Sequence, residues 1–333
     1  MKALIYRHKN TMKDFGLELA DVPEPELRDT DLLVEIIAVG INPGDTQIRQ
    51  NTEPESGGYI ILGYEFSGVV RKTGLRATGF QTGDRVFGIG DPTRNGAYAG
   101  QMAVDYRNVS TFPSASPFDH AAAVPLITLT AWQSIFRIND RLPEDVKTIM
   151  IVGAAGGVGS MALQLLKARS SVRIIATASR PESSAWCKKM GADEVINHNQ
   201  EILPQLRAIG LEQVDMIFSV NGLKDSIRWV HQVIRPYGYL AIIDLHGAVD
   251  FTKLMRKSVT IFLEMVFTRG IYNYQSELPA KVLAELIELV KAGKIITPAT
   301  TIIKGLTVEN MKKAHALIEK GDVIGKIVLT VAE

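Results

Sequence analysis

Cysteine is the scarcest residue in this 333-residue sequence and occurs once, as Cys187. A single cysteine cannot form an internal disulfide, and it excludes a structural zinc site built from four cysteines. This cysteine usage is typical of proteins from reducing compartments, so we expect a cytoplasmic protein.

An excess of charge of one sign is also lacking, because 37 Lys and Arg oppose 36 Asp and Glu for a net charge of +1. Nucleic-acid and anionic-membrane binders usually carry a basic excess, so we expect neither partner. No apolar run approaches the ~18 residues of a membrane-spanning helix, and the first residues lack the apolar centre of a signal peptide. With 46% apolar residues the chain can bury a substantial core, and its length suggests about two domains.

The first 120 residues are dense in turn-forming residues, which separate short segments with strand character. Pairs such as Pro43-Gly44, Gly83-Asp84 and Asn95-Gly96 mark turns. The predicted strands are Ala3–Tyr6, Leu32–Val39, Ser67–Arg71, Arg85–Phe87 and Ala99–Val104. Short strands at close spacing indicate a small β-barrel or a similar antiparallel core.

Strands and helices alternate from about residue 121 to residue 266. The predicted strands are Thr148–Val152, Arg173–Ala178, Glu194–Asn197, Val214–Val220 and Tyr239–Ile243, with helices at Ser160–Arg169 and Ser183–Met190. Repeated alternation of this kind indicates a parallel sheet covered by helices on both faces.

The last part of the chain, residues 267–333, carries two amphipathic helices and a terminal strand. The first helix begins near Leu278 and ends before Gly293, and the second runs from about Val308 to Lys320. Thr307 and Gly321 suit the two ends of that second helix. Two helices and the strand at Ile324–Val331 are too little for a third core, so we expect them to join one of the first two.

A glycine-rich turn between a strand and a helix is the strongest motif. Its spacing is Gly153-x-x-Gly156-Gly157-x-Gly159, which is not the literal G-x-G-x-x-G form. Glycines let the backbone approach a dinucleotide pyrophosphate, and the helix N-terminus supplies N–H groups and partial positive charge. A turn without a ligand is the alternative, but the surrounding alternation of strands and helices favours a dinucleotide site. The predicted contacts are Gly153, Ala155, Gly156, Gly157, Val158 and Gly159.

The end of the second strand indicates which dinucleotide binds. An NAD site places Asp or Glu there, on the ribose 2′-OH. This sequence has Ser179-Arg180 and no acid until Glu182. A hydroxyl and a guanidinium suit a 2′-phosphate, so we predict NADPH, although Arg180 in a solvated loop is the alternative. Lys188 and Lys189 can help neutralise the phosphate, but at least one is expected on a solvated helix face.

The whole chain resembles the medium-chain dehydrogenase/reductase superfamily in its zinc-free quinone-oxidoreductase branch, especially bacterial proteins labelled zinc-type alcohol dehydrogenase-like. The motifs that carry the resemblance are Gly40-Ile-Asn-Pro-Gly-Asp45 with Arg49, Gly63-Tyr-Glu-Phe-Ser-Gly68, Gly83-Asp-Arg-Val86, Leu129-Thr-Ala-Trp132, the glycine-rich turn, Gly191-Ala-Asp193 and Gly325-Lys-Ile-Val328. The most telling stretch is residues 177–193. Each motif alone is weakly specific, but their shared order is strong.

The resemblance implies an α/β protein in which a GroES-like β-barrel catalytic domain carries an inserted Rossmann domain with a doubly wound parallel sheet. The catalytic domain would comprise residues 1–121 and 267–333, and the NADP-binding domain residues 122–266. The family commonly has its active site between these domains and forms a homodimer across the Rossmann sheets. The resemblance also implies that Thr130 contacts the cofactor.

Zinc-dependent members of the superfamily hold their metal with residues that this sequence lacks. The matching positions hold Asn42, Tyr64 in place of a histidine, and the segment 125–131 without Cys or His. The segment 88–100 has no cysteine-rich lobe. The histidines are scattered, at His8, His120, His198, His231, His246 and His315. We therefore expect neither catalytic nor structural zinc.

The chemistry that remains without a metal is hydride transfer to an activated acceptor. Alkoxide stabilisation by a Lewis acid is lost, whereas a quinone or an α,β-unsaturated carbonyl needs only hydrogen-bond donors and a proton source. Three residues are the catalytic candidates: the Asn42 amide and the Tyr64 phenol as donors, and Tyr59 as a second phenol lining the acceptor pocket. Each has a structural alternative, as a turn residue, a space-filler and a surface aromatic, respectively.

Other polar residues near these positions are expected to be structural. Asp45 and Glu65 fit scaffold ion pairs, and Cys187 fits a helix position remote from the acceptor. The sequence thus predicts an NADPH-dependent reductase of quinones or enones. The alternatives are a zinc-type alcohol dehydrogenase with replaced ligands, an NADPH-binding sensor or structural protein with little turnover, and an enoyl-thioester reductase.

Overall fold

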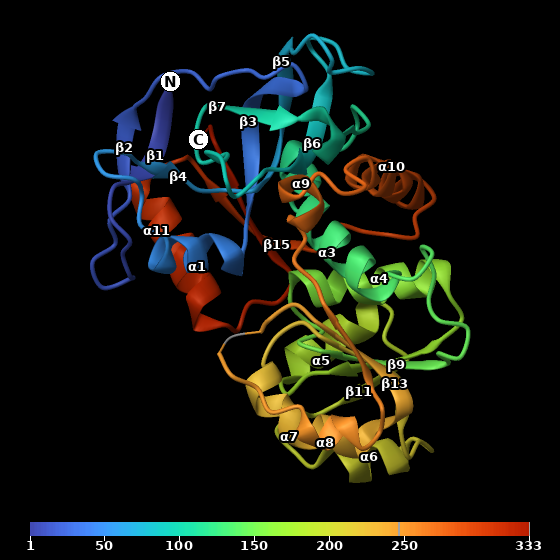
Figure 1. Cartoon of the computed structure of the whole chain (residues 1–333). Coiled ribbons are helices and arrows are strands. Elements are labelled where there is room, and N and C mark those ends of the chain that lie inside the picture. Colours follow the sequence, from blue (N-terminus) through green and yellow to red (C-terminus); the bar gives the residue numbers. More distant parts are fainter. Residues whose placement is uncertain (246, 333) are drawn as a thin grey trace. The chain divides into compact units, whose positions relative to one another are not determined.

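The computed structural model describes residues 1–245 and 247–332, and the chain folds into two compact units (Figure 1). Unit 2 is an insertion in the sequence of unit 1, and both chain ends belong to unit 1. Unit 1 comprises Met1–Leu126, Phe267–Lys291 and Ile296–Glu333, and unit 2 comprises Ile127–Val266 and Ala292–Ile295.

Unit 1 is built on mostly antiparallel sheets. Among the described residues, one sheet has the strand order β15-β16-β3-β5-β6-β8, with β7 also paired to β3, and a second has the order β2-β1-β4. The strands are β1 (Lys2–Tyr6), β2 (Glu18–Asp21), β3 (Asp31–Ile41), β4 (Ile60–Ile61), β5 (Glu65–Thr73), β6 (Arg85–Ile89), β7 (Gln101–Asp105), β8 (Val109–Thr111), β15 (Ala299–Lys304) and β16 (Lys326–Thr330). The expected antiparallel core is therefore present, and it includes short strands that the sequence pattern did not reveal.

Strand β3 organises unit 1, because it pairs with β5, β7 and β16. Its Leu32, Val34 and Ile36 side chains are buried in a cluster that also contains residues of β16. The C-terminal segment thus completes the sheet of the N-terminal part, as expected from its small size.

The helical segments of unit 1 differ from the sequence prediction at one important place. Pro43-Gly44 was expected to form a turn, but it begins a helix, since the fixed φ of proline suits the first helical position. The helices are α1 (Pro43–Asn51), the 3-10 turn η1 (Tyr106–Asn108), α2 (Phe118–Ala122), α9 (Thr268–Ile271), α10 (Leu278–Lys291) and α11 (Val308–Lys320). Thr307 and Gly321 bound α11 as expected: the Thr307 hydroxyl accepts from the Asn310 N–H, and Gly321 has a φ of 75°.

Unit 2 contains the expected parallel sheet with alternating helices. Within the described residues its strand order is β11-β10-β9-β12-β13-β14, and every neighbouring pair is parallel. The strands are β9 (Thr148–Val152), β10 (Arg173–Thr177), β11 (Glu194–Ile196), β12 (Val214–Ser219), β13 (Ile234–Ile242) and β14 (Thr260–Leu263). The helices are α3 (Pro125–Ile135), α4 (Gly157–Arg169), α5 (Pro181–Lys189), α6 (Ile202–Ala208), α7 (Leu223–Val233) and α8 (Thr252–Met255).

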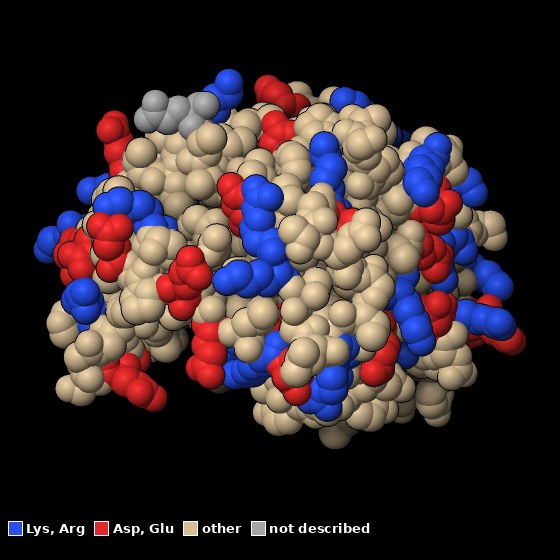
Figure 2. All heavy atoms as spheres, turned by 90° about the horizontal axis from the view of Figure 1, so that it is seen from above, with Lys and Arg blue, Asp and Glu red and all other residues tan. Residues whose placement is uncertain are grey.

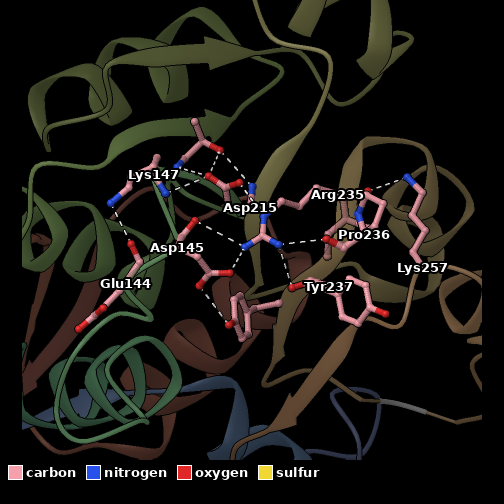
Figure 3. A network of polar contacts seen from close by, with 11 residues as sticks. Glu144, Asp145, Lys147, Asp215, Arg235, Pro236, Tyr237 and Lys257 are labelled. Atoms are coloured by element: carbon pink, nitrogen blue, oxygen red, sulfur yellow. Dashed lines mark hydrogen bonds and ion pairs between the residues drawn. The ribbon is translucent and has the colours of Figure 1, made fainter.

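A polar network ties together the amino ends of three of these strands (Figure 3). The Asp215 carboxylate accepts hydrogen bonds from the backbone N–H groups of Lys147 (2.9 Å) and Thr148 (2.8 Å). Its other oxygen accepts from Nε of Arg235 at 2.8 Å. These contacts hold the amino-terminal ends of β9, β12 and β13 together. Open α/β sheets bind ligands at the other side, beyond the carboxyl ends of their strands.

The distribution of surface charge and the character of the helices match the near-zero net charge and the lack of long apolar runs in the sequence. On the face drawn in Figure 2, basic and acidic side chains are interspersed, and neither sign covers a broad area. None of the helices in the described residues has the length and apolar character needed to cross a membrane.

Candidate functional site

The glycine-rich turn lies between the end of β9 and the start of α4, in unit 2. Gly153 has a φ of +78°, a conformation that side chains other than glycine rarely adopt. A Cβ atom on Gly159 would lie 2.5 Å from the Cα of Ala154, so only glycine lets α4 pack this closely on the turn. A Cβ on Gly156 would meet only the Gly153 carbonyl, at 3.7 Å, so the space beside Gly156 is open. The turn therefore fits a phosphate cradle.

The position of this turn in the sheet supports the same interpretation. The chain runs from β9 to β10 on one side and continues later from β12 on the other side of β9. This reversal makes the carboxyl end of β9 a topological switch point, where doubly wound sheets bind ligands. Ala155, Gly157 and Val158 are partly exposed residues here, at the N-terminus of a 13-residue helix.

Ser179 and Arg180 follow the carboxyl end of β10, the strand next to β9. Arg180 is exposed, and its backbone is held at the start of α5 by Ser183, whose hydroxyl donates to the Arg180 carbonyl at 2.9 Å. Thr177 connects this strand end to the glycine-rich turn, because its hydroxyl accepts from the Gly153 N–H at 3.4 Å. Ser179 is half-buried beside them. The end of β10 thus offers a hydroxyl and a guanidinium at the same sheet edge as the turn.

The two lysines of α5 lie at the other end of that helix, about 13 Å from Arg180 at 1.5 Å per residue. The Lys188 ammonium donates to the Asp193 carbonyl. The Lys189 ammonium lies 5.4 Å from the centroid of the Trp186 ring. Both lysines are therefore engaged locally, and the structure does not bring them to the end of β10.

Cys187 and Thr130 are two further residues of unit 2 for which the sequence made a prediction. Cys187 is fully buried in α5, and burial raises the pKa of its thiol to about 12. A protonated, buried thiol is a poor nucleophile. Cys187 lies in a helix, as expected. Thr130 lies in α3, is 6% exposed, and accepts a hydrogen bond from the Ser134 hydroxyl through its carbonyl at 2.7 Å.

In unit 1, Asn42 belongs to a buried polar cluster with Glu65 and Lys326. The amide nitrogen of Asn42 donates to the Gly40 carbonyl (3.2 Å) and to Oε2 of Glu65 (3.0 Å). Its amide oxygen accepts from the Lys326 ammonium at 2.6 Å. Since both amide hydrogens and the oxygen are already engaged, the geometry favours a positioning role for Asn42 over donation to an acceptor.

Lys326 is the residue of this cluster to which the sequence analysis assigned no role. Its ammonium also donates to the Ile41 carbonyl at 2.7 Å and forms an ion pair with Glu65 at 2.8 Å. Glu65 therefore forms an ion pair within the scaffold, as expected, and Lys326 is its partner. The available signal was a lysine inside the otherwise apolar terminal strand.

Tyr64 precedes this cluster and is 2% exposed. Its ring meets the Phe267 ring edge-on, with centroids 5.9 Å apart. Its hydroxyl is buried without a hydrogen-bond partner among the described residues. Burial, together with the nearby Asp45 carboxylate, raises the pKa of the phenol, so the group remains a protonated donor. An unpaired buried hydroxyl costs about 1–3 kcal/mol, which suggests that a ligand group completes it.

Asp45 forms no ion pair within the described part of the chain, unlike the prediction. It is 1% exposed and accepts from the Asn42 backbone N–H at 2.8 Å, which ties the start of α1 to the end of β3. Burial raises the pKa of its carboxyl to about 6. The Asn42 N–H and the Lys326 charge lower this pKa, but by less than burial raises it.

Tyr59 lies outside this cluster. It is half-buried, packs against the core of unit 1, and has the Arg7 guanidinium 6.0 Å from its ring centroid. Sequence proximity to Tyr64 thus does not bring the two phenols into one hydrogen-bonded group.

No group of three or more His, Cys, Asp or Glu side chains in the described residues is arranged to hold a metal ion. His315 is fully buried and contacts the Tyr98 hydroxyl through Nε2 at 3.2 Å, and burial lowers its pKa to about 3. His8 pairs instead with Glu53 at 2.8 Å. His246 lies outside the described residues. The Asn42 amide is engaged by Glu65 and Lys326, the Tyr64 phenol is protonated, and neither is a good zinc ligand.

An antiparallel barrel-type unit with an inserted doubly wound unit defines a class of nucleotide-dependent dehydrogenases and reductases. Two family models match the chain accordingly: an alcohol dehydrogenase GroES-like domain over residues 28–114 and a zinc-binding dehydrogenase over residues 157–288. The chain belongs to the medium-chain dehydrogenase/reductase superfamily of oxidoreductases, and within it to the zinc-type alcohol dehydrogenase-like proteins.

Individual relatives match over nearly the full length. A zinc-type alcohol dehydrogenase-like protein of Staphylococcus aureus is 32% identical, covering 93% of this chain and 92% of its own. The mitochondrial NAD(P)H oxidoreductase RTN4IP1 of Danio rerio is 26% identical over 91% of this chain and 84% of its own. The crystal structure of a provisionally assigned zinc-dependent alcohol dehydrogenase from Rhizobium etli superposes with a TM-score of 0.95 at 35% identity, covering 99% and 98% of the two chains.

Proposed function

We propose that this protein is an NADPH-dependent oxidoreductase that transfers a hydride to a quinone or another α,β-unsaturated carbonyl without a metal. The observation that carries the proposal is the hydroxyl of Tyr64, which is buried, protonated and without a partner in the described residues. This hydroxyl stands where the family's zinc-dependent members have a histidine ligand.

The glycine-rich turn holds the pyrophosphate in this proposal. Gly153 and Gly159 shape the turn, Gly156 lets the backbone approach the phosphates, the N–H groups of Gly157 and Val158 face them, and Ala155 completes the loop. Ser179 and Arg180 hold the 2′-phosphate, since a guanidinium binds a phosphate through two parallel hydrogen bonds. Thr130 is an additional contact on the evidence of the family resemblance alone. NADPH, when bound, supplies the hydride.

Tyr64 acts on the acceptor oxygen. As hydride reaches the conjugated carbonyl, negative charge develops on that oxygen, and a donor placed in a site of low polarity stabilises it more than water would. Asn42 acts through its neighbours, because its engaged amide positions the loop between β3 and α1. Tyr59 lines the acceptor pocket as a lesser contributor.

Bound zinc does not fit these residues. The family name of the relatives refers to zinc, but an amide held by Lys326 and a protonated phenol offer no ligand set of the thiolate and imidazole kind. The protein's acceptors are therefore proposed to be those that need no Lewis acid. The name of the NAD(P)H oxidoreductase relative supports the same class of hydride donor.

The proposal includes a homodimeric assembly and a cytoplasmic location. We propose a homodimer that forms along β14, the edge strand of the unit 2 sheet, which exposes 53% of Leu263. The single, buried cysteine suits a cytoplasmic protein.

The decisive experiment is anaerobic oxidation of NADPH and NADH by the purified protein with a panel of quinones, enones, aldehydes and alcohols. Zinc content is measured on the same sample. We expect turnover with quinones or enones, a preference for NADPH, and less than stoichiometric zinc. Stoichiometric zinc with alcohol oxidation would establish the zinc-type alternative. Tight NADPH binding without oxidation across the panel would establish a sensor or structural protein.

A further inference from the structure

A cavity of about 170 Å³ lies in unit 1, beside the amino end of β3. The candidate residue Asn42 follows the opposite, carboxyl end of that strand. The cavity is larger than the about 10–15 Å³ that one water needs. Its polar lining comes from four separate segments: the turn before β3, the loop after β6, the β7–η1 region, and the α9–α10 connection. Its residues serve no step of the proposed reaction.

Two arginines bring unused donors to this cavity. The Arg28 guanidinium is exposed and makes no hydrogen bond or ion pair with the described residues. Arg94 holds the buried Asp31 carboxylate through two N–H groups, at 3.0 and 2.6 Å, and its remaining three N–H groups have no partner among the described residues. Both side chains line the cavity. The cavity wall therefore presents guanidinium donors without their usual acceptors.

The side-chain amide of Asn108 is a further polar group of the cavity lining that has no hydrogen-bond partner among the described residues. The residue is 7% exposed and lines the cavity, but its side chain makes no hydrogen bond with the described residues. Its Nδ2 lies 3.7 Å from the position of a Cβ on Gly270, which also lines the cavity. The amide is thus directed at the cavity. An occupant of the cavity can therefore give this amide the hydrogen-bond partner that it lacks within the described residues.

Arg107 holds one wall of the cavity in place. Its Nε and Nη2 donate to the Asp105 carboxylate at 2.9 and 2.8 Å. Its Nη1 donates to Oδ1 of Asn273 (3.0 Å) and to the Ser276 hydroxyl (2.7 Å). Asn273 has a φ of +48°, a conformation that costs energy unless its surroundings hold it. These bonds preorganise the site across segments about 170 residues apart in sequence, which reduces the entropy cost of binding.

The balance of charges indicates the ligand chemistry. Asp31 and Asp105 pair with Arg94 and Arg107, so Arg28 is the cation of the lining that has no ion-pair partner among the described residues. Asp91 also lines the cavity; its Oδ1 accepts from Thr93, and its Oδ2 has no partner among the described residues. A cavity lined by both a guanidinium and a carboxylate matches a ligand with a carboxylate and a hydrogen-bond donor. A phosphate dianion brings a second negative charge, which Asp91 would repel.

We propose that this cavity binds a small carboxylate ligand that carries a hydroxyl or ammonium group on a neighbouring carbon. The ligand carboxylate pairs with Arg28 and the free N–H groups of Arg94. Its donor meets Asp91 or the amide oxygen of Asn108. The site is independent of the proposed hydride transfer and requires no dinucleotide.

Isothermal titration calorimetry of the full chain, without NADPH and at constant ionic strength, tests this proposal. The probes are glycerate (carboxylate and hydroxyl) and serine (carboxylate and ammonium), compared with propionate, glycerol and inorganic phosphate. We expect saturable binding of glycerate or serine with a dissociation constant of about 1 mM or tighter, and at least about tenfold weaker binding of the other three. The probe that binds identifies which donor the site takes.

Variants connect the binding to the cavity. Arg28→Ala and Asn108→Leu should each weaken the probe at least about tenfold, whereas Arg207→Ala, an exposed arginine of unit 2, should leave it unchanged. If Asn108→Leu lowers the melting temperature too far, Gly270→Leu fills the cavity without removing a polar group. Arg180→Ala must have no effect, which separates this site from the dinucleotide site. No saturable binding of either probe, binding insensitive to Arg28→Ala, or equal binding of phosphate would overturn the proposal.

Discussion

The ammonium of Lys326 lies 2.8 Å from Oε2 of Glu65, and the two side chains are 4% and 0% exposed. The pair joins β16, near the end of the chain, to β5. Its desolvated charges are balanced by further bonds, from the Leu126 N–H to Glu65 (2.8 Å) and from Lys326 to Asn42 and Ile41. A buried pair of this kind specifies geometry, and breaking it by removing one partner leaves an uncompensated buried charge.

Lys326→Met should therefore reduce the free energy of unfolding by about 3–5 kcal/mol, because Glu65 would remain buried and unpaired. Urea unfolding followed by circular dichroism measures the loss. The matched control is Lys2→Met, whose pair with Asp21 is exposed and screened by solvent, so its loss should change stability far less. The double variant Glu65→Gln/Lys326→Met should recover part of the stability. Equal losses in the two single variants would contradict the importance of the buried pair.

Tyr64→Phe should lower turnover and leave stability the same or higher. Removing the hydroxyl deletes the proposed donor, so kcat should fall at least about 10²-fold. It also removes a buried polar group without a partner, which costs about 1–3 kcal/mol in the native state. Stopped-flow oxidation of NADPH, a cofactor titration and thermal melting are measured on the same preparation. Tyr59→Phe is the control and should affect kcat much less. Unchanged turnover in Tyr64→Phe would show that the phenol only fills space.

Arg180→Ala should weaken NADPH binding about 10–100-fold while changing NADH binding little, because only NADPH carries the 2′-phosphate. Fluorescence titration with both nucleotides measures the ratio. Lys188→Ala is the control, since its ammonium is engaged with the Asp193 carbonyl. Equal losses for the two nucleotides would rule out the assigned role of Arg180.

Asp45→Asn should change how stability depends on pH. Burial raises the pKa of Asp45 from 3.8 to about 6, so its contribution to stability is fully present below pH 3.8 and is lost as pH rises through about 6. The shift corresponds to about 3 kcal/mol. The asparagine variant keeps an acceptor for the Asn42 N–H but cannot ionise, so it should be more stable than the parent at pH 8 and lose this advantage towards pH 4. Urea unfolding of both proteins at pH 4, 6 and 8 gives the difference, and a difference constant with pH would be evidence against a buried charge.

The edge strand β14 provides a test of the proposed homodimer. Leu263 and Met265 are 53% and 50% exposed at or beside that edge. Leu263→Asp should weaken self-association at least about tenfold, since a charge would be buried in the contact. Light scattering after size-exclusion chromatography measures the mass. Leu75→Asp is the control, on a residue of unit 1 that is 92% exposed. A monomer in the unmodified protein would refute the dimer directly.

Local sequence was sufficient to predict the first strand of unit 2 and the turn that follows it. The strand Thr148–Val152 occupies the residues expected from its apolar β-branched pattern, and the glycine-rich turn follows it directly. Helix α11 has its expected bounds because its capping signals are adjacent in the chain. The short strands β2, β4 and β8 escaped prediction, since each has four residues or fewer and depends on its neighbours for pairing.

The sequence by itself determined that Asn42 and Tyr64 stand at the positions that the family resemblance matches to zinc ligands. Only the tertiary structure decided whether these two side chains have hydrogen-bond partners. The Asn42 amide is engaged by Lys326, a residue 284 positions away, whereas the Tyr64 hydroxyl is left without a partner in the described part of the chain. Hydrogen-bond satisfaction depends on groups brought together by long-range packing, which no local pattern encodes. The cavity beside Arg28 and Asn108 depends on folding for the same reason.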